Sequence, residues 1–348
     1  MPALTSWPDL LGGLVQGVDQ SREATAWAME QILGGAATPA QIAAFVVALR
    51  AKGETVEEIA GLADTMIDFA TPIELSGPAV DVVGTGGDRS NTVNISSMAA
   101  LVAAGAGARV VKHGNRAASS ACGSADVLEA LGVVLDLPPE AQQGVADEAG
   151  IAFLFAPHYH PALRHASVVR RELGIPTTFN YLGPLTNPAQ PGAQAVGVAD
   201  GRMAAMVAGV FAARGHQGLV VHGGDGLDEL TTTTSSRVWV HAGGSVTAVE
   251  LEPLDLGLPR AVPADLTGGD PAHNARVVHQ VLAGRPGPVH DVVVLNAAAT
   301  LVAFHGPDPA RLHEQLAEQL VVSEDAIASG RAAQTLARWV EATHTAIS

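Results

Sequence analysis

The first part of the chain has a helical pattern of apolar residues and no strand pattern. Apolar positions recur at helical spacing in "SREATAWAMEQILGG", "TPAQIAAFVVALRAKG" and "TVEEIAGLADTMIDFA". The second stretch opens on Thr38-Pro39, a favourable N-cap and first-turn pair, and stops at Lys52-Gly53. The sequence therefore predicts a small all-helical domain over residues 1–72.

Short apolar runs alternate with helical patterns from about residue 80 onward. The predicted strands are "AVDVVG", "ARVVKHG", "VVLDL", "IAFLF", "AQAVGVAD" and "GLVVHG", followed by an antiparallel hairpin, "RVWVHAGGSVTAVEL", with a Gly-Gly turn. Helices are predicted at 94–105, 123–132, 139–149 and 202–214, and three more close the chain at 274–283, 289–304 and 323–343. This alternation predicts an α/β fold whose central, mostly parallel sheet is flanked by helices.

One helical stretch interrupts this alternation. The segment "HPALRHASVVRRELGIPTTFNYLGPLTNP" reads as helix where a strand would be due. We expect it to return to the helical domain, which makes that domain discontinuous. The predicted division is 1–72 plus about 160–186 for the helical domain, and 73–159 plus 187–348 for the α/β domain.

Composition narrows the choice of partners. The formal net charge of −16 disfavours nucleic acid and anionic membranes as partners, and it would repel an anionic ligand unless metal ions or local cations reverse the field. The single cysteine, Cys122, excludes an intrachain disulfide, and the N-terminus lacks a signal-peptide pattern. We therefore expect a cytoplasmic protein with no membrane or nucleic-acid partner.

A glycine-rich loop, Gly84-Thr85-Gly86-Gly87-Asp88, follows the first predicted strand. Glycines let the backbone approach a ligand and turn its N–H groups inward, and the next helix begins near Asn94, Ser96 and Ser97. The carboxyl ends of parallel strands are where open α/β sheets bind ligands. The loop alone leaves two interpretations open, a phosphate site and a tight turn with ordinary helix caps.

Two further loops follow strand ends. "KHGNRAASSACGSAD", from Lys112 to Asp126, gathers cations and hydroxyl groups beside the first loop, although a basic surface loop would look similar. "HGGDGLDELTTTT" carries Asp228 and Glu229, which could reach a hard cation such as Mg²⁺ together with substrate phosphates. The ordinary alternative for such an acidic pair is a solvated turn.

Other candidate residues carry weaker signals. Arg170 and Arg171 could form a solvated helix face, or one of them could pair with a substrate carboxylate. Thirteen histidines make any single one a weak candidate, and none has zinc-site spacing. Cys122 has no base that the sequence pairs with it, so it reads as a packing residue.

These motifs together resemble the anthranilate phosphoribosyltransferases, enzymes of tryptophan biosynthesis. The matching stretches are "GTGGD", "NISS", "KHGNRAASSACGSADVLEALG", "FAPHYHPALRHASVVRRELGIPTTFNYLGPLTNP" and "HGGDGLDELT". They cover residues from about 80 to 235, and the helical start and closing helices agree. The resemblance implies a homodimer of nucleoside-phosphorylase type, with the dimer contact on the helical domain and the active site between the domains. It also implies transfer of the phosphoribosyl group of phosphoribosyl pyrophosphate to the amine of anthranilate, with Mg²⁺.

The resemblance also assigns site residues. The residues it places around phosphoribosyl pyrophosphate are Gly84, Gly87, Asp88, Thr92, Asn94, Ile95, Ser96, Ser97, Lys112, His113, Gly114, Asn115, Arg116, Ser119, Ser120 and Ser124. Those it places at anthranilate are Gly84, Asn115, Arg170, His113 and His160. One Mg²⁺ would be bound by Ser96 and Glu229, and a second by Asp228 and Glu229. No catalytic nucleophile is implied, and Lys112 with the metals would stabilise the charge of the transition state.

Two positions depart from the family pattern. Arg89 stands where a small residue is expected, and Leu163 stands where some relatives have an aromatic residue in the substrate channel. Two rival functions remain at this point. A pyrimidine nucleoside phosphorylase shares the fold, but Asp228-Glu229 and "KHGNR" argue against it. A non-catalytic nucleic-acid-binding relative is disfavoured by the net charge of −16.

Overall fold

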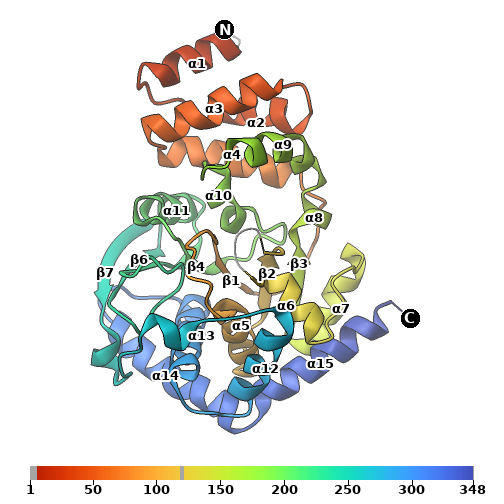
Figure 1. Cartoon of the computed structure of the whole chain (residues 1–348), viewed down its shortest axis with the longest axis vertical. Helices are drawn as coiled ribbons and strands as arrows, with labels where there is room; N and C mark the ends of the chain where they lie inside the picture. Colours follow the sequence, from red (N-terminus) through yellow and green to blue (C-terminus); the bar gives the residue numbers. More distant parts are fainter. Residues whose placement is uncertain (1–5, 118–120, 348) are drawn as a thin grey trace.

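The computed structural model describes residues 6–117 and 121–347, and it divides into a helical part and an α/β part (Figure 1). The helical part is formed by α1 (Trp7–Val15), α2 (Arg22–Leu33), α3 (Pro39–Lys52), α4 (Val56–Asp68), α9 (Arg164–Leu173) and α10 (Phe179–Leu182). Side-chain caps start the first four helices. Thr38 and Thr55 form full capping boxes at the starts of α3 and α4, and serines cap α1 and α2.

A seven-stranded sheet forms the centre of the α/β part. Its strands are β1 (Val80–Gly84), β2 (Val110–Gly114), β3 (Ile151–Phe155), β4 (Ala193–Gly197), β5 (Gln217–Gly223), β6 (Ser236–Ala242) and β7 (Ser245–Leu251). The strand order is β3-β2-β1-β4-β5-β6-β7. The first five are parallel, and β6 and β7 form the antiparallel hairpin that the Gly-Gly turn predicts. The predicted fold class is confirmed.

Helices of the α/β part pack against this sheet or against one another beside it. They are α5 (Ile95–Gly105), α6 (Ser124–Ala130), α7 (Pro139–Ala149), α8 (Ala156–Tyr159), α11 (Gly201–Ala213), α12 (Pro271–Leu282), α13 (Pro288–His305), α14 (Leu312–Ala328) and α15 (Arg331–Thr345). Short 3-10 turns lie at Pro161–Leu163, Gly183–Thr186, Pro253–Leu256 and Pro263–Leu266.

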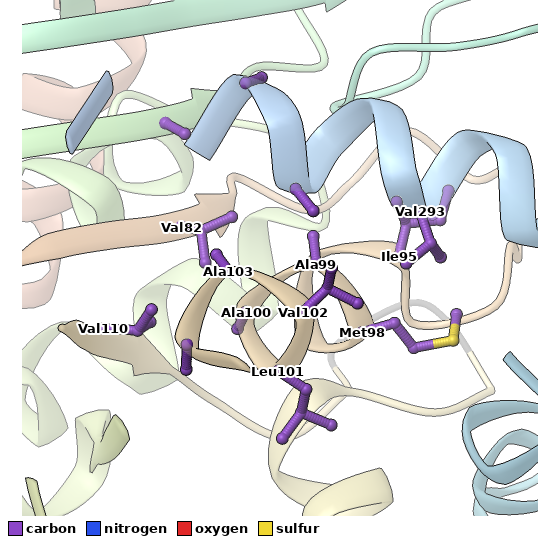
Figure 2. Packing of buried hydrophobic residues seen from close by; sticks show 14 of the residues in the cluster. Val82, Ile95, Met98, Ala99, Ala100, Leu101, Val102, Ala103, Val110 and Val293 are labelled. Atoms are coloured by element: carbon purple, nitrogen blue, oxygen red, sulfur yellow. The ribbon is translucent and has the colours of Figure 1, made fainter. Parts of the chain in front are cut away.

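The largest apolar core lies around α5 and α13. Figure 2 shows Ile95 and Ala99 of α5 next to Val293 of α13, with Val82 of β1 close by. Seven of the eleven α5 residues are alanine, serine or glycine, so the helix can approach its neighbours closely. The eighteen residues of α13 are long and apolar enough to cross a membrane by length and composition, but 72% of this stretch is buried within the protein. We read α13 as the core helix of this part.

Two sequence predictions are wrong in detail. Residues 133–137 form no strand, because they pair with no strand of the sheet. Their apolar side chains, Val133, Leu135 and Leu137, are buried in the core instead. The predicted closing helix at 323–343 is two helices, α14 and α15, separated at Gly330, whose φ of 78° breaks a right-handed helix. Helix α1 agrees with the predicted all-helical domain and adds one helix before the three helical stretches named there.

The segment after β3 packs on the helical part. Helix α9 contacts α2 and α3, as Figure 1 shows. Helix α11, which follows β4, packs along α4. A single apolar cluster therefore runs from the helical part through α11 to the buried residues Val196 and Val220 of the sheet. The two parts share a packed contact, which fixes the helical part beside the carboxyl ends of the strands.

A close backbone contact at the end of β4 gives a stability prediction. A Cβ at Gly197 would overlap the carbonyl oxygen of Asp228, whereas a Cβ at Gly144, within α7, would meet no atom within 4 Å. We expect Gly197→Ala to destabilise the fold by about 1–3 kcal/mol and Gly144→Ala to stabilise it by about 0.5–1 kcal/mol. Thermal unfolding of both variants measures this, and a Gly197→Ala midpoint equal to that of the wild type would refute the contact.

Candidate active site

Loops from several strands meet at the carboxyl edge of the sheet. The backbone of residues 228–229 crosses directly over the ends of β1 and β4. A Cβ at Gly84 would overlap the Asp228 carboxylate, and one at Gly197 would overlap the Asp228 backbone. Glycine at both strand ends is what allows the acidic loop to lie against the glycine-rich loop.

Three carboxylates come together where these loops meet. Oxygen atoms of Asp88, Asp228 and Glu229 lie within 4.8 Å of one another. The Gly86 N–H donates to Asp228 Oδ2 at 2.6 Å, while Glu229 Oε2 is buried with no hydrogen-bond partner among the described residues. Burial and the neighbouring Asp88 raise the pKa of Asp228 to about 7. Burial and the carboxylates beside it also raise the pKa of Glu229.

This cluster has the chemistry of a site for a divalent cation. Like charges that are buried together are unfavourable unless a proton or a cation offsets them. The unpartnered Glu229 oxygen leaves one ligand atom free, and carboxylate oxygens are what Mg²⁺ prefers. Ser96 lines the same small cavity as Asp228 and Glu229, so the residues predicted as metal ligands are brought together. Asp88 joins them, which the metal prediction did not include.

Lys112 supplies the positive charge next to this cluster. Its ammonium group donates to the Val82 carbonyl and, at 3.2 Å, to Ser96 Oγ. Burial lowers the pKa of Lys112 to about 8, against the attraction of Asp81 and Glu229. The side chain therefore remains mostly protonated at neutral pH. A buried cation at this position can pair with an anionic ligand that enters the cleft.

The start of α5 lies beside the glycine-rich loop. Asn94 precedes the helix but does not cap it, because its Nδ2 donates to the Cys122 carbonyl at 3.1 Å and its Oδ1 accepts from Asn274 Nδ2 at 2.8 Å. The hydroxyl of Ser97 is buried with no partner in the described part of the chain. An uncapped helix start with a free hydroxyl is suited to an anion. Thr92 lies just before it and forms a bridge with Thr267.

The basic loop after β2 is only partly available to a ligand. Arg116 pairs with Asp126, at 3.1 Å, and with Glu129, and its guanidinium lies over the Phe155 ring. Arg116 is therefore paired internally and is not free for phosphate in this conformation. Asn115 Oδ1 accepts from the Arg116 N–H at 2.7 Å. Ser119 and Ser120 lie outside the described residues, and Gly114 and Ser124 flank the loop at the end of β2 and the start of α6.

Two histidines lie next to each other, His113 on β2 and His160 directly after α8. The rings of His113 and His160 are 5.2 Å apart, and both side chains are buried. His113 Nδ1 donates to the Gly183 carbonyl at 3.2 Å, since a carbonyl can only accept. Its Nε2 is then a buried acceptor without a partner among the described residues. Burial lowers the pKa of His113 to about 3, so the ring is neutral.

Arg170 approaches from the helical part. Its guanidinium lies 5.4 Å from the centre of the Phe179 ring, and it forms no ion pair within residues 6–117 and 121–347. Burial lowers the pKa of this group, which nevertheless stays charged. Arg171, next to it, is exposed. A half-buried arginine without a carboxylate partner is suited to bind a carboxylate from a ligand.

The two positions that depart from the family pattern are also placed. Arg89 is exposed with a φ of 61°, in the left-handed region that glycine would occupy without strain, and it makes no ion pair with the described residues. Leu163 is half-buried and packs against the apolar cluster of the helical part.

Sequence reasoning missed the amides that hold the site in shape. Asn296, on the apolar helix α13, accepts from the Leu230 N–H at 3.0 Å and donates to the Leu230 carbonyl at 2.8 Å. Asn187 donates to Asp81 at 2.9 Å, and burial raises the pKa of that carboxyl to about 6. Asn296 could have been identified from the sequence, because a polar residue in the middle of an apolar helix needs hydrogen-bond partners.

Known proteins share this fold and these motifs. A family model described as "Glycosyl transferase family, helical bundle domain" matches residues 8–70, and "Glycosyl transferase family, a/b domain" matches residues 76–333. The fold and the site thus define a glycosyl transferase of the two-domain class. The resemblance read from the sequence points further, to one family within this class.

Similar proteins carry one name. The anthranilate phosphoribosyltransferase of Nocardioides sp. is 58% identical over 340 residues, covering 98% of this chain and 99% of the relative, and that of Thermobifida fusca is 56% identical over 336 residues, covering 97% and 96%. The chain belongs to the anthranilate phosphoribosyltransferase family.

Solved structures agree with this assignment. The enzyme from Thermus thermophilus superposes with a TM-score of 0.89 at 41% identity, covering 97% of this chain and 99% of that one. The enzyme from Saccharomyces cerevisiae, in complex with PRPP and Mg, superposes with a TM-score of 0.83 at 27% identity, covering 99% and 95%.

The raised pKa of Asp228 gives a pH-dependent stability prediction. An acid whose pKa is raised by folding contributes stability below its unfolded pKa, near 4, and loses it as the pH rises through about 7. Asp228→Asn removes this loss, so we expect the metal-free variant to melt about 2–4 °C above the wild type at pH 8 and near it at pH 4.

Asp225→Asn is the matched control for this prediction. Asp225 accepts from the Thr231 hydroxyl at 2.8 Å and from the Leu227 N–H at 3.2 Å. Its neutralisation removes charge-assisted hydrogen bonds, so this variant should melt below the wild type. Differential scanning calorimetry across pH 4–8 makes the comparison. Equal shifts for the two variants would contradict the special environment of Asp228.

Proposed function

We propose that this chain is an Mg²⁺-dependent anthranilate phosphoribosyltransferase acting in the cytoplasm. It transfers the 5-phosphoribosyl group of phosphoribosyl pyrophosphate to the amine of anthranilate, giving N-(5-phosphoribosyl)anthranilate and pyrophosphate, the second step of tryptophan synthesis from chorismate. The observation that carries the proposal is the acidic cluster of Asp88, Asp228 and Glu229 beside the buried Lys112. An acidic protein needs such an arrangement to hold a diphosphate.

The glycine-rich loop and the start of α5 bind the phosphates in this proposal. The backbone around Gly87 and the uncapped first turn of α5 offer N–H groups that can donate to an anion. Ser97 offers a hydroxyl without a partner among the described residues. Lys112 approaches from the neighbouring strand. Arg116 would reach a phosphate only by leaving Asp126 and Glu129, so we assign it a structural role in the free enzyme.

Two Mg²⁺ ions fit the donor set. Ser96 with Glu229 would hold one ion, and Asp228 with Glu229 would hold the other. Asp88 lies close enough to both carboxylates to contribute to either, directly or through water. When bound, Mg²⁺ supplies positive charge that offsets the charge developing on the departing pyrophosphate.

Positioning and charge account for the reaction. The bond between the ribose carbon and the pyrophosphate oxygen breaks, the anthranilate nitrogen bonds to that carbon, and one amine proton is released. Lys112 stabilises the leaving group, and the helix start holds its oxygens. The arylamine is neutral at pH 7, so the step needs no strong general base. The neutral His113 offers Nε2 as a hydrogen-bond acceptor near the acceptor substrate.

Anthranilate would lie between the two parts of the molecule. Arg170 would bind its carboxylate from the helical part, with Asn115 and Gly84 on the side of the sheet. His113 and His160 would line the space between them. The apolar contact of α11 with α4 holds the two parts together, so these groups keep a fixed separation.

Metal dependence tests the function directly. We expect anthranilate fluorescence to fall only when phosphoribosyl pyrophosphate and Mg²⁺ are both present. Glu229→Gln should lower kcat/KM by about 10²–10³, because the variant loses a charged ligand at the leaving group. Glu148→Gln, exposed on α7, is the control and should keep wild-type kinetics. Full turnover by Glu229→Gln at limiting Mg²⁺ would refute the metal role.

The helical part is also the surface that we propose for a homodimer. Val15, Val47 and Val168 are exposed on α1, α3 and α9, at 79%, 39% and 48%. Because α3 packs against both α1 and α9, these side chains lie on neighbouring helices of one part. Exposed apolar side chains on neighbouring helices are the observation that supports an interface between subunits here.

Charge introduction on this surface tests the dimer. We expect Val47→Glu to convert a dimer into a folded monomer, since an unpaired carboxylate in an apolar interface opposes association. Val321→Glu, on α14 and 70% exposed, is the matched control and should leave the dimer intact. Size-exclusion chromatography with light scattering reports the mass. A Val47→Glu protein that stays dimeric would place the interface elsewhere.

A further inference from the structure

A buried glutamate lies where the helical part meets the α/β part. Glu54 belongs to the loop between α3 and α4, and its side chain is 0% exposed. Oε2 lies 2.8 Å from Arg202 Nη2 and 3.6 Å from Arg50 Nη1. Oε1 accepts from the Thr178 hydroxyl at 2.7 Å. Both carboxylate oxygens are thus fixed by charged or hydroxyl donors.

The cationic partners of Glu54 connect it to the sheet. Arg202 lies in the first turn of α11, the helix that directly follows β4. Asp200 caps that helix and accepts from Arg50 Nη2 at 2.5 Å. The loop before α4 is therefore anchored to the same end of β4 where Gly197 faces the acidic loop.

The third partner of Glu54 leads to Arg170. Thr178 is 1% exposed and directly precedes Phe179, the first residue of α10. The Arg170 guanidinium lies over the Phe179 ring and has no carboxylate partner in the described part of the molecule. The ring is therefore the contact that orients this arginine. A shift of Thr178 would move the ring and the arginine with it.

We propose that Glu54 is a positioning residue that sets the place of the acceptor-binding Arg170 relative to the phosphate site. The inference rests on the proposed function, in which Arg170 binds the carboxylate of an aromatic acid. The connection runs from α11 through Glu54 and Thr178 to Phe179 and Arg170. It fixes the distance between the group that holds the acceptor carboxylate and the loops that hold the sugar diphosphate. Loss of the Thr178 contact should affect the acceptor substrate specifically, because Thr178 leads to Phe179 and Arg170, while the contacts of Glu54 with Arg202 and Arg50 on the side of the sheet remain.

The hydroxyl of Thr178 allows a sharp test. Thr178→Val keeps the shape of the side chain but leaves Glu54 Oε1 without its donor, whereas Thr178→Ser keeps the donor. Thr65→Val is the matched control, because the buried Thr65 hydroxyl donates to the Gly61 carbonyl within α4 at 2.9 Å and does not touch Glu54. Arg170→Lys gives the reference for a lost carboxylate contact.

We expect Thr178→Val to raise the KM for anthranilate about tenfold, in the direction of Arg170→Lys. The KM for phosphoribosyl pyrophosphate, and kcat at saturating anthranilate, should stay within about twofold of the wild type. Thr178→Ser should restore the anthranilate KM. Thr65→Val should leave both KM values unchanged while its melting temperature falls.

Three outcomes overturn the proposal. An unchanged anthranilate KM in Thr178→Val, with an active wild type and a raised KM in Arg170→Lys, removes the positioning role and leaves the proposed function standing. Parallel losses in both KM values and kcat would show that Thr178 serves the fold in general. Absence of turnover by the wild type would overturn the proposed function, and the positioning role with it.

Discussion

The close approach of Asp88, Asp228 and Glu229, of which Asp228 is buried and the other two are half-buried, is the constraint on which the rest of the active site depends. Carboxylates this close repel each other, and burial makes the repulsion stronger. The acidic loop keeps them there. Asn296 forms two hydrogen bonds with the backbone of Leu230 in this loop, and the loop lies in close contact with the strand ends at Gly84 and Gly197. The large apolar core around α13 stabilises a site that is unfavourable by itself.

The division of the molecule into two parts matches a division of the chemistry. In the proposed function, charge stabilisation for the diphosphate would come from the strand ends, where Lys112 and the carboxylates are close together. Recognition of the acceptor would come from Arg170 on α9, which belongs to the helical part. Such a division requires a defined distance between the two parts. The shared apolar cluster along α11 and the polar contacts of Glu54 supply two independent means of holding that distance.

Features with local signals were predictable, and features that depend on distant contacts were not. Strand and helix alternation and the Gly-Gly hairpin are short-range patterns, and the structure has them where the sequence predicts them. The strand predicted at 133–137 was wrong because an apolar run without a neighbour in the sheet becomes buried extended chain. The same limit applies to the site. The sequence motifs predicted that Asp228 and Glu229 bind metal together, and both line one cavity. Asp88 lies with them because the glycine-rich loop meets the acidic loop, which no local pattern predicts. Arg116 looked available for phosphate, and its pairing with later carboxylates shows only in the folded chain.

The balance of local charge shows why a net charge of −16 does not oppose a diphosphate ligand. Lys112 is buried, so its field is poorly screened by solvent, and the acidic cluster next to it becomes an attraction for the ligand once cations occupy it. The exposed acidic residues that make up most of the total act through water and salt, which weaken them over about 10 Å. The sign of the ligand that binds therefore depends on the few charges that are shielded from solvent and on the cations bound there. The same few charges lower the stability of the free protein.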